Sequence, residues 1–280
     1  MAIHSPRFPM KHRSFLKWAG GKFRLTEAIN RQFPKNKTCL VEPFVGAGSV
    51  FLNSNFERYI LADINPDLIT LFNQVKADVE SFITALKPIF FHLEANTKSY
   101  YYARREEFNQ SQDPFLRSVL FVYLNRFGFN GLCRYNSKNE FNVPFGAYKT
   151  HYFPEKELRY FAEKAQSAVF FCGDFQQTFQ LADENCIIYC DPPYAPLPQN
   201  SNFTQYAGNE FSEAEQTALA HLALHTAQQR QIPVLISNHD TQFTREIYRQ
   251  AKLKRIKVQR SISQTAERRI KVNELIAIFR

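Results

Sequence analysis

The sequence CIIYC at residues 186–190 is followed at once by Asp191-Pro192-Pro193-Tyr194. Five apolar residues, rich in β-branched and aromatic side chains and closed by prolines, predict a buried strand of a parallel sheet. Proline cannot donate to a sheet ladder and fixes φ near −65°, so the strand must end here. The Asp191 carboxylate is therefore expected at the carboxyl end of a strand, where open α/β sheets bind their ligands.

The four residues after this strand suit a planar ring that bears an amino group. The Asp191 carboxylate and the Pro192 carbonyl can accept amino hydrogens, and Tyr194 offers an aromatic face on which a ring can stack. We therefore take Asp191, Pro192, Pro193 and Tyr194 as the candidate catalytic residues. Considered alone, the same four residues also fit a strand-terminating turn with a chance tyrosine.

The composition is that of a globular protein with a basic surface. The 280 residues are 44% hydrophobic, and 35 Lys and Arg against 26 Asp and Glu leave a net charge of +9. This balance fits a polyanionic partner, although many basic proteins bind none. No apolar run approaches the roughly 18 residues of a membrane span, and the amino terminus lacks the hydrophobic segment of a signal peptide. Residues 1–14, which include Lys11, His12 and Arg13, are expected to form a loosely held basic tail.

The cysteine and histidine pattern predicts neither disulfides nor a metal site. The five cysteines are odd in number, mostly lie in apolar runs and form no Cys-x-x-Cys pair, and the seven histidines are scattered. Buried, reduced thiols in a cytoplasmic protein are the interpretation that fits this spacing. We expect no metal.

Two glycine-rich stretches come early in the chain. At residues 18–22, Trp-Ala-Gly-Gly-Lys precedes a helix expected at about residues 23–32. A phosphate-binding loop is disfavoured because the Walker spacing and the following Ser or Thr are absent; a glycine turn that packs Trp18 against a small ligand is favoured. Gly46 and Gly48 follow a strand expected at residues 39–44, and such glycines let backbone approach a ligand.

An acidic residue ends the second expected strand. Residues 59–62 lead to Asp63, which lies 15 residues past Gly48 (63 − 48). That is near the place where an acidic side chain at the second strand holds a ribose in nucleotide-binding folds. The alternative is a capping role, because Asn65 and the next residues open a helix.

The alternation of strands and helices lapses between residues 68 and 150. Helices are expected at about 68–86, 93–109 and 114–126. Residues 126–149 then interleave Arg, Lys, Asn, aromatic residues and glycines, which predicts a hairpin that presents side chains to a nucleic acid. An aromatic-rich structural loop is the alternative for this segment.

The alternation resumes after residue 167. A mobile-looking loop at 195–209 is a candidate cover for the site, and Ser212 with Glu215 predicts a capping box for a helix ending near residue 230. The remaining expectations are strands at 168–173, 233–237, 253–262 and 273–279, a helix at 241–251 and a charged loop at 267–271.

Together these motifs resemble the adenine-specific DNA methyltransferases of the Dam type, the α-class enzymes that modify GATC. The resemblance rests on residues 18–22, the Glu-Pro-Phe-Val-Gly-Ala-Gly sequence at 42–48, the 126–149 insert and the Asp191–Tyr194 motif, in that order. It implies an α/β fold with a Rossmann-like seven-stranded sheet that binds S-adenosylmethionine, and an inserted, mostly helical target-recognition domain. The implied domains are catalytic at 1–66 and 152–280 and DNA-binding at 67–151.

The resemblance also implies roles for individual residues. The cofactor-binding residues would be Trp18, Lys22, Asp63 and Asp191, with Phe44, Gly46, Asp174 and Phe175 as weaker candidates. Arg134 and Leu132 match the family's base readers, Phe129 and Asn130 match residues that fill the opened duplex, and Lys17, Asn139 and Tyr148 are further DNA contacts. Relatives often have tyrosine at position 129 and can carry a basic residue at position 147, where this chain has Ala147.

The activity implied by the resemblance is direct transfer of a methyl group to the exocyclic amine of a flipped adenine in double-stranded DNA. The implied setting is bacterial and cytoplasmic, on the nucleoid, with no protein partner. Three alternatives remain at this point: an amino-methyltransferase acting on cytosine or RNA, an inactive nucleic-acid-binding methyltransferase fold, and a protein methyltransferase with an Asn-Pro-Pro-Tyr-like site. The acid at position 191 counts against the last.

Overall fold

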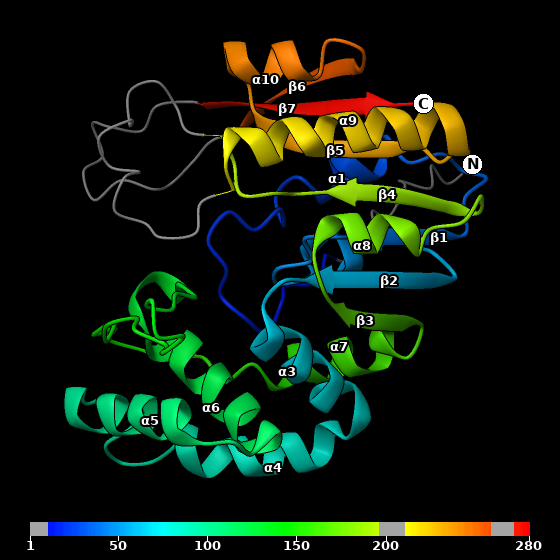
Figure 1. The fold of residues 1–280 in the computed structure, drawn as a ribbon. Coiled ribbons are helices and arrows are strands. Elements are labelled where there is room, and N and C mark those ends of the chain that lie inside the picture. Colours follow the sequence, from blue (N-terminus) through cyan, green and yellow to red (C-terminus); the bar gives the residue numbers. More distant parts are fainter. Residues whose placement is uncertain (1–10, 196–210, 259–271) are drawn as a thin grey trace, which may run out of the picture.

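The computed structural model describes residues 11–195, 211–258 and 272–280, and Figure 1 shows their arrangement. The expected loop at 195–209, apart from its first residue, and the charged loop at 267–271 lie outside the described residues.

A seven-stranded sheet forms the centre of the protein, with the strand order β3-β2-β1-β4-β5-β7-β6. The strands are β1 Cys39–Glu42, β2 Arg58–Asp63, β3 Ala168–Cys172, β4 Cys186–Cys190, β5 Val234–His239, β6 Lys252–Val258 and β7 Val272–Phe279. The first five strands of this order, β3, β2, β1, β4 and β5, run parallel to one another. Strand β7 is antiparallel to both of its neighbours, β5 and β6. Every residue of β1, β4 and β5 is buried, as is expected where helices cover both faces of a parallel sheet.

The chain reverses its direction of travel across the sheet between β1 and β4. It passes outward from β1 to β2 and β3, then returns to β4 on the other side of β1. Crossover connections that leave to opposite sides open a crevice at the carboxyl ends of these two strands. The Asp191–Tyr194 motif comes directly after β4, so the fold places it at that crevice.

The helices fill the connections between the strands. They are α1 Thr26–Asn30, α2 Ser49–Leu52, α3 Pro66–Ala77, α4 Val79–Phe90, α5 Lys98–Gln110, α6 Pro114–Phe127, η1 Phe129–Gly131 (a 3₁₀ helix), α7 Glu155–Ala165, α8 Phe175–Gln180, α9 Glu213–Arg230 and α10 Gln242–Ile247. Figure 1 shows α3, α4, α5 and α6 gathered beyond the β3 edge of the sheet. Helix α3 contacts β2 and β3 as well as α4 and α6, so it joins this helical group to the sheet.

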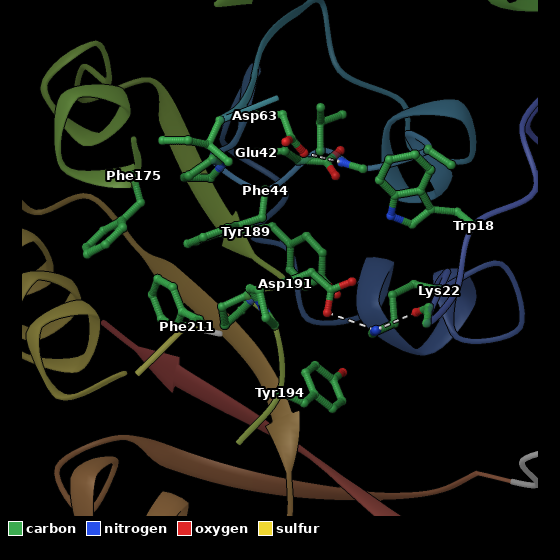
Figure 2. Close-up of a pocket in the computed structure, with 18 of the residues that line it drawn as sticks. Trp18, Lys22, Glu42, Phe44, Asp63, Phe175, Tyr189, Asp191, Tyr194 and Phe211 are labelled. Atoms are coloured by element: carbon green, nitrogen blue, oxygen red, sulfur yellow. Dashed lines mark hydrogen bonds and ion pairs between the residues drawn. The ribbon is translucent and has the colours of Figure 1, made fainter. Parts of the chain in front are cut away.

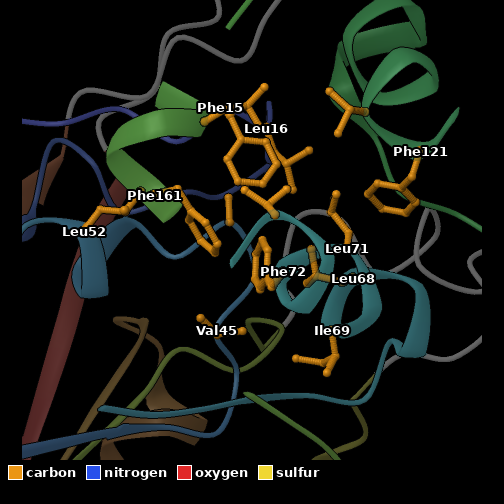
Figure 3. Close-up of a cluster of buried hydrophobic side chains, with 14 of the residues drawn as sticks. Phe15, Leu16, Val45, Leu52, Leu68, Ile69, Leu71, Phe72, Phe121 and Phe161 are labelled. Carbon is orange, nitrogen blue, oxygen red and sulfur yellow. The ribbon is translucent and has the colours of Figure 1, made fainter. Parts of the chain in front are cut away.

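Two hydrophobic layers hold the sheet between them. One contains Phe72 of α3, Phe121 of α6 and Phe161 of α7, together with Phe15 from the amino-terminal segment (Figure 3). The other is formed with α8, α9 and Tyr248 against the opposite face of the sheet. The first layer runs without a break from the sheet into the helices at residues 66–127, so these helices share the sheet's core.

Three details of the fold differ from the sequence-based expectations. Residues 11–14 are not a loose tail: the His12 ring stacks on Tyr160 with centroids 3.6 Å apart, and its backbone exchanges two 2.8 Å hydrogen bonds with the Asn53 side chain. The expected helix at 68–86 is two helices, because Asp78 leaves helical geometry and caps α4 by accepting from the Ser81 amide at 3.0 Å. Of the five thiols, three are buried, one is half-buried and one is exposed.

Candidate active site

A pocket of about 860 Å³ lies at the carboxyl ends of the central strands, within the size range of small-molecule sites. Figure 2 shows side chains from widely separated parts of the chain, among them Trp18, Asp63 and Tyr194, around this pocket. All of the candidate catalytic and cofactor residues line it: Trp18, Lys22, Phe44, Gly46, Asp63, Asp174, Phe175, Asp191, Pro192, Pro193 and Tyr194. The fold therefore brings together the side chains that the sequence singled out.

Asp191 is paired with a lysine from the far end of the sequence. The Lys22 ammonium lies 2.8 Å from the Asp191 carboxylate, donates to the Gly20 carbonyl at 2.8 Å, and sits 4.4 Å from the centroid of the Tyr194 ring. Burial raises the pKa of Asp191, and the positive charge of Lys22 opposes that rise. Lys22 therefore contacts the Asp191–Tyr194 motif directly, and its charge favours the ionised form of the Asp191 carboxylate.

The Tyr194 ring is held at its edge and at its hydroxyl. The hydroxyl donates to the Glu274 carboxylate at 3.0 Å. The His239 ring meets the tyrosine edge-on, with centroids 4.8 Å apart. Glu274 and His239 are cross-strand partners on β7 and β5, so two neighbouring strands set the orientation of the aromatic face.

Two buried amides hold the main chain of the motif, and the sequence analysis did not identify either as part of the site. Gln216 of α9 donates to the Pro193 carbonyl at 2.7 Å, and the Asn238 side chain of β5 accepts from the Ala195 amide at 3.0 Å. Asn238 also donates to the Gln216 side-chain oxygen at 2.9 Å, which joins the two anchors. Both amides are at most 1% exposed, and buried polar groups paired in this way rigidify the chain they hold.

Replacing Gln216 with glutamate is expected to slow methyl transfer, because an oxygen would then face the Pro193 carbonyl in place of a donor. A lost buried hydrogen bond costs about 1–3 kcal/mol, or roughly 5- to 150-fold in rate. Single-turnover kinetics at saturating cofactor measure the effect, with Gln229→Glu, on the exposed side of the same helix, as the control. A wild-type rate for Gln216→Glu would show that the anchor is dispensable.

Asp63 faces the pocket and also supports its glycine turn. One carboxylate oxygen accepts from the Gly46 amide at 3.1 Å and the other from the Asn65 amide at 3.0 Å. Burial raises the pKa of Asp63, and these backbone hydrogen bonds oppose the rise. Gly46 has φ +47°, and a Cβ there would lie 2.8 Å from the Trp18 ring nitrogen. The glycine therefore allows Trp18 to cover the turn.

An aromatic slot forms another part of the pocket. Phe44 stacks on Phe175 with centroids 5.8 Å apart, and Phe211 meets both rings edge-on at 5.5 and 5.6 Å. The sequence did not predict Phe211 as a pocket residue, because its position directly before the expected helix cap Ser212 indicates only the start of a helix. Asp174, at the mouth of the slot, caps α8 by accepting from the Gln177 amide at 2.8 Å.

Glu42, the last residue of β1, is a buried acid that no sequence argument assigned. It lines the pocket at 2% exposure, and one of its carboxyl oxygens has no hydrogen-bond partner among the described residues. Burial, and next the charge of Asp191, raise the pKa of Glu42 well above its usual range. The rise favours the protonated acid, which can donate a hydrogen bond as well as accept one.

Several candidate DNA contacts form a second cluster around η1. The Lys17 ammonium lies 4.0 Å from the centroid of the Tyr148 ring and donates to the Arg126 carbonyl at 2.8 Å. The Asn130 amide donates to the Tyr148 hydroxyl at 2.6 Å, and Phe129 is 39% exposed beside it. Burial, and next the charge of Arg126, lower the pKa of Lys17 to about 8.

The remaining candidates lie on residues 132–142. The exposed Arg134 donates from Nε to the Asn142 side chain at 2.7 Å, while Leu132 is half-buried. Asn139 adopts φ +59° in the turn that joins the two arms, where its amide donates to the Asn136 carbonyl. The arms before and after this turn are antiparallel, as expected for a hairpin, but among the described residues their β pairing consists of isolated bridges, Gly128 with Phe145 and Tyr135 with Phe141.

Two negative findings concern the described residues only. Within residues 11–195, 211–258 and 272–280, no group of three or more His, Cys, Asp and Glu is placed to hold a metal ion. In the same ranges, no helix has the length and apolarity needed to cross a bilayer.

Comparison with known proteins identifies the family to which the chain belongs. Residues 18–262 match the family described as D12 class N6 adenine-specific DNA methyltransferase. A DNA adenine methylase of Haemophilus influenzae is 72% identical over 96% of this chain and 94% of its own length. DNA adenine methylases of Escherichia coli K12 and Vibrio cholerae are 57% and 56% identical over 96% of this chain and of their own lengths.

The α/β fold, with its seven-stranded sheet and a pocket at the strand ends, is consistent with that of a methyltransferase. The chain belongs to the D12 class of N6 adenine-specific DNA methyltransferases. It is thus an enzyme that methylates adenine in DNA, and the alternatives of an RNA, cytosine or protein substrate and of an inactive fold are set aside.

Proposed function

We propose that this enzyme transfers the methyl group of S-adenosylmethionine to the N6 amine of the adenine in GATC. The transfer would take place on double-stranded DNA at the Asp191–Tyr194 motif. The observation that carries the proposal is the convergence of residues from 18–22, from the ends of β1 and β2, and from 191–194 on one pocket.

The pocket fits the chemistry of S-adenosylmethionine, which supplies an activated methyl group on a positively charged sulfur. The slot of Phe44, Phe175 and Phe211 suits a flat adenine ring. Each oxygen of Asp63 keeps a second lone pair that can accept from a ribose hydroxyl. The Glu42 oxygen that has no partner among the described residues lies in the same pocket as the Asp191 carboxylate. Both can accept hydrogen bonds from the ligand's polar groups, and the Asp191 carboxylate can also stabilise its positive charge.

The target base must leave the duplex to reach this pocket, because an exocyclic amine is inaccessible inside the stack. The Asp191 carboxylate and the Pro192 carbonyl would accept the two amino hydrogens, with the ring stacked on Tyr194. These acceptors oppose delocalisation of the lone pair into the ring and direct it towards the methyl group. Asp191 also stabilises the positive charge that develops on the amine.

The enzyme's main contribution would be geometric. Binding two reactants in a near-attack arrangement supplies about 7–11 kcal/mol in favourable cases. The anchors of the motif support this role, because Gln216, Asn238 and Glu274 fix its main chain and its aromatic ring. The amine's proton can leave after the transfer, so the mechanism needs no strong base.

Sequence recognition is assigned to residues 67–151. Arg134 and Leu132 would read bases of GATC, and the exposed Phe129 with Asn130 would fill the space that the flipped base leaves. Lys17, Tyr148 and Asn139 would contact the DNA around them. The net charge of +9 supports binding to the backbone phosphates.

The test is to methylate duplexes with tritiated S-adenosylmethionine and to identify the product. We expect label in N6-methyladenine only, at GATC, and much slower reaction on duplexes with one changed base pair. Label in another nucleoside would refute the proposed chemistry, and equal rates on all duplexes would refute the proposed sequence preference.

Replacing Asp63 with alanine is expected to weaken cofactor binding, since the ribose hydroxyls lose a charged acceptor worth about 1.5–3 kcal/mol. The support of Gly46 by the same carboxylate adds to the loss. Calorimetry measures the dissociation constant, and Asp183→Ala, at the other end of the sheet, is the control. An unchanged constant would remove Asp63 from the cofactor site.

A further inference from the structure

The end of β2 and the start of α3 connect the cofactor pocket to residues 126–149, which we call the recognition segment. Asp63 ends β2, and Asn65 and Asp67 begin α3. The side chains of Asn65 and Asp67 reach residues 133 and 135, the two neighbours of the proposed base reader Arg134.

The first contact joins Asp67 to Tyr135. The Tyr135 hydroxyl donates to the Asp67 carboxylate at 2.7 Å, and Arg117 of α6 donates to the other carboxylate oxygen at 2.7 and 3.1 Å. The carboxylate is only 15% exposed. Burial raises the pKa of the Tyr135 hydroxyl, so it remains a neutral donor to a charged acceptor, which is a strong type of hydrogen bond.

The second contact joins Asn65 to Cys133. The Asn65 amide nitrogen lies 3.3 Å from the Cys133 sulfur, while its oxygen caps α3 by accepting from the Asp67 and Leu68 amides. The backbone amide of Asn65 donates to Asp63. One asparagine therefore contacts the cofactor-site carboxylate, the helix end and the recognition segment.

These contacts leave Arg134 facing outward. Side chains alternate between two sides along an extended chain, and the burial follows this rule: Cys133 and Tyr135 are half-buried while Arg134 is exposed. The Tyr135 ring also packs edge-on against Phe141 of the opposite arm, with centroids 5.7 Å apart. The flanking residues are thus fixed to the body of the protein, while the exposed Arg134 side chain bonds to Asn142 of the opposite arm and can move from there to reach a base.

We propose that Tyr135, held by Asp67, is a positioning residue that determines sequence specificity. It would set the place of Arg134 relative to helix α3, and through Asn65 relative to the cofactor pocket. The flipped base and the base read by Arg134 would then be held at a fixed separation. This inference rests on the proposed function, because it assumes that Arg134 reads a base pair of GATC.

The experiment compares kcat/KM on a GATC duplex with kcat/KM on duplexes that carry one changed base pair. Tyr135→Phe removes one hydroxyl and keeps the ring. We expect it to lower the preference for GATC over the duplex changed at the pair that Arg134 reads. The expected factor is about three to ten, the effect of one hydrogen bond. The dissociation constant of the cofactor and the Tm should stay near the wild-type values.

Two further variants keep the test specific. Tyr152→Phe is the control, because it also removes a tyrosine hydroxyl that donates to a carboxylate, that of Glu157. Tyr152 lies outside the recognition segment, so this variant should keep the wild-type preference for GATC. Asp67→Asn should lower the preference as Tyr135→Phe does. Asp67→Asn also weakens the pair with Arg117, but the two losses of preference should not add in the double variant, because both changes weaken the Tyr135–Asp67 contact.

The outcomes separate this inference from the proposed function. If Arg134→Ala abolishes the preference and Tyr135→Phe retains it, Arg134 is the reader but the anchor does not position it. An equal loss on all duplexes, with a lower Tm, would reduce Tyr135 to a structural residue and overturn the inference. If Arg134→Ala itself keeps the preference, both the reader assignment and the inference fall.

Discussion

Replacing Asp191 with alanine is expected to abolish methyl transfer even when DNA and cofactor are saturating. The change removes the acceptor that we propose for the target amine, and it takes from the Lys22 ammonium the carboxylate that lies 2.8 Å away. Removing one group that stabilises developing charge costs about 10²–10³-fold in rate, and the loss of amine positioning adds to that. Single-turnover methylation of a GATC duplex measures the effect.

Two variants serve as references for this result. Asp191→Asn keeps the shape and one acceptor oxygen but not the charge, so its rate should fall between those of the wild type and Asp191→Ala. Asp183→Ala changes an exposed acid paired with Arg58, just before the opposite end of β4, and should transfer normally. Near-normal transfer by Asp191→Ala would remove this carboxylate from the chemistry.

Replacing Arg134 with alanine is expected to collapse the preference for GATC. A bidentate arginine–guanine contact discriminates by about 1–3 kcal/mol per base pair, or roughly 5- to 150-fold in kcat/KM. The guanidinium is exposed and, among the described residues, bonds across the two arms to Asn142, so it can reach a base after a small movement. The measurement is kcat/KM on a GATC duplex and on its single-base relatives.

Lys17→Ala provides the contrast, because a contact to the DNA backbone carries no sequence information. This variant should weaken binding to GATC and to other duplexes by similar factors and reduce the dependence on salt. The comparison is made at two salt concentrations. If Arg134→Ala slowed every duplex equally, Arg134 would be a backbone anchor and the base readers would lie elsewhere.

The part of the site that the sequence predicts correctly is local in the chain. Prolines after CIIYC mark the end of β4, and an acid after an apolar run marks the end of β2, because the carboxyl ends of parallel strands share one edge of the sheet. The observed strands agree closely with these patterns. The fold then gathers the predicted residues into one pocket without any further signal.

The supporting residues could not be predicted, because their partners are remote in the sequence. Gln216 lies inside a helix whose pattern explains its burial without a function, and its contact to Pro193 exists only after folding. Lys22 was assigned to the cofactor by resemblance, and only the folded chain pairs it with Asp191, 169 residues away (191 − 22). Asp67 was expected only to open a helix, which gives no hint of its bond to Tyr135.

Contacts with residues that are remote in the sequence also explain why the amino-terminal segment differs from the expectation. Residues 1–14 are expected from their basic side chains to form a loosely held tail. Yet the His12 ring stacks on Tyr160 of α7, and Phe15 is fully buried between Phe72 and Phe161. A single buried aromatic residue fixes a segment that its composition would leave free.

The most direct test of the account is a crystal structure of the enzyme with a GATC duplex and a non-reactive analogue of S-adenosylmethionine. The measured quantities are the distances from the N6 atom of the target adenine to the Asp191 carboxylate and to the Pro192 carbonyl. We predict hydrogen-bond distances to both, of about 2.7–3.2 Å, with the adenine ring stacked on Tyr194. An adenine that remained in the duplex, or that bound with its amine away from Asp191, would contradict the mechanism.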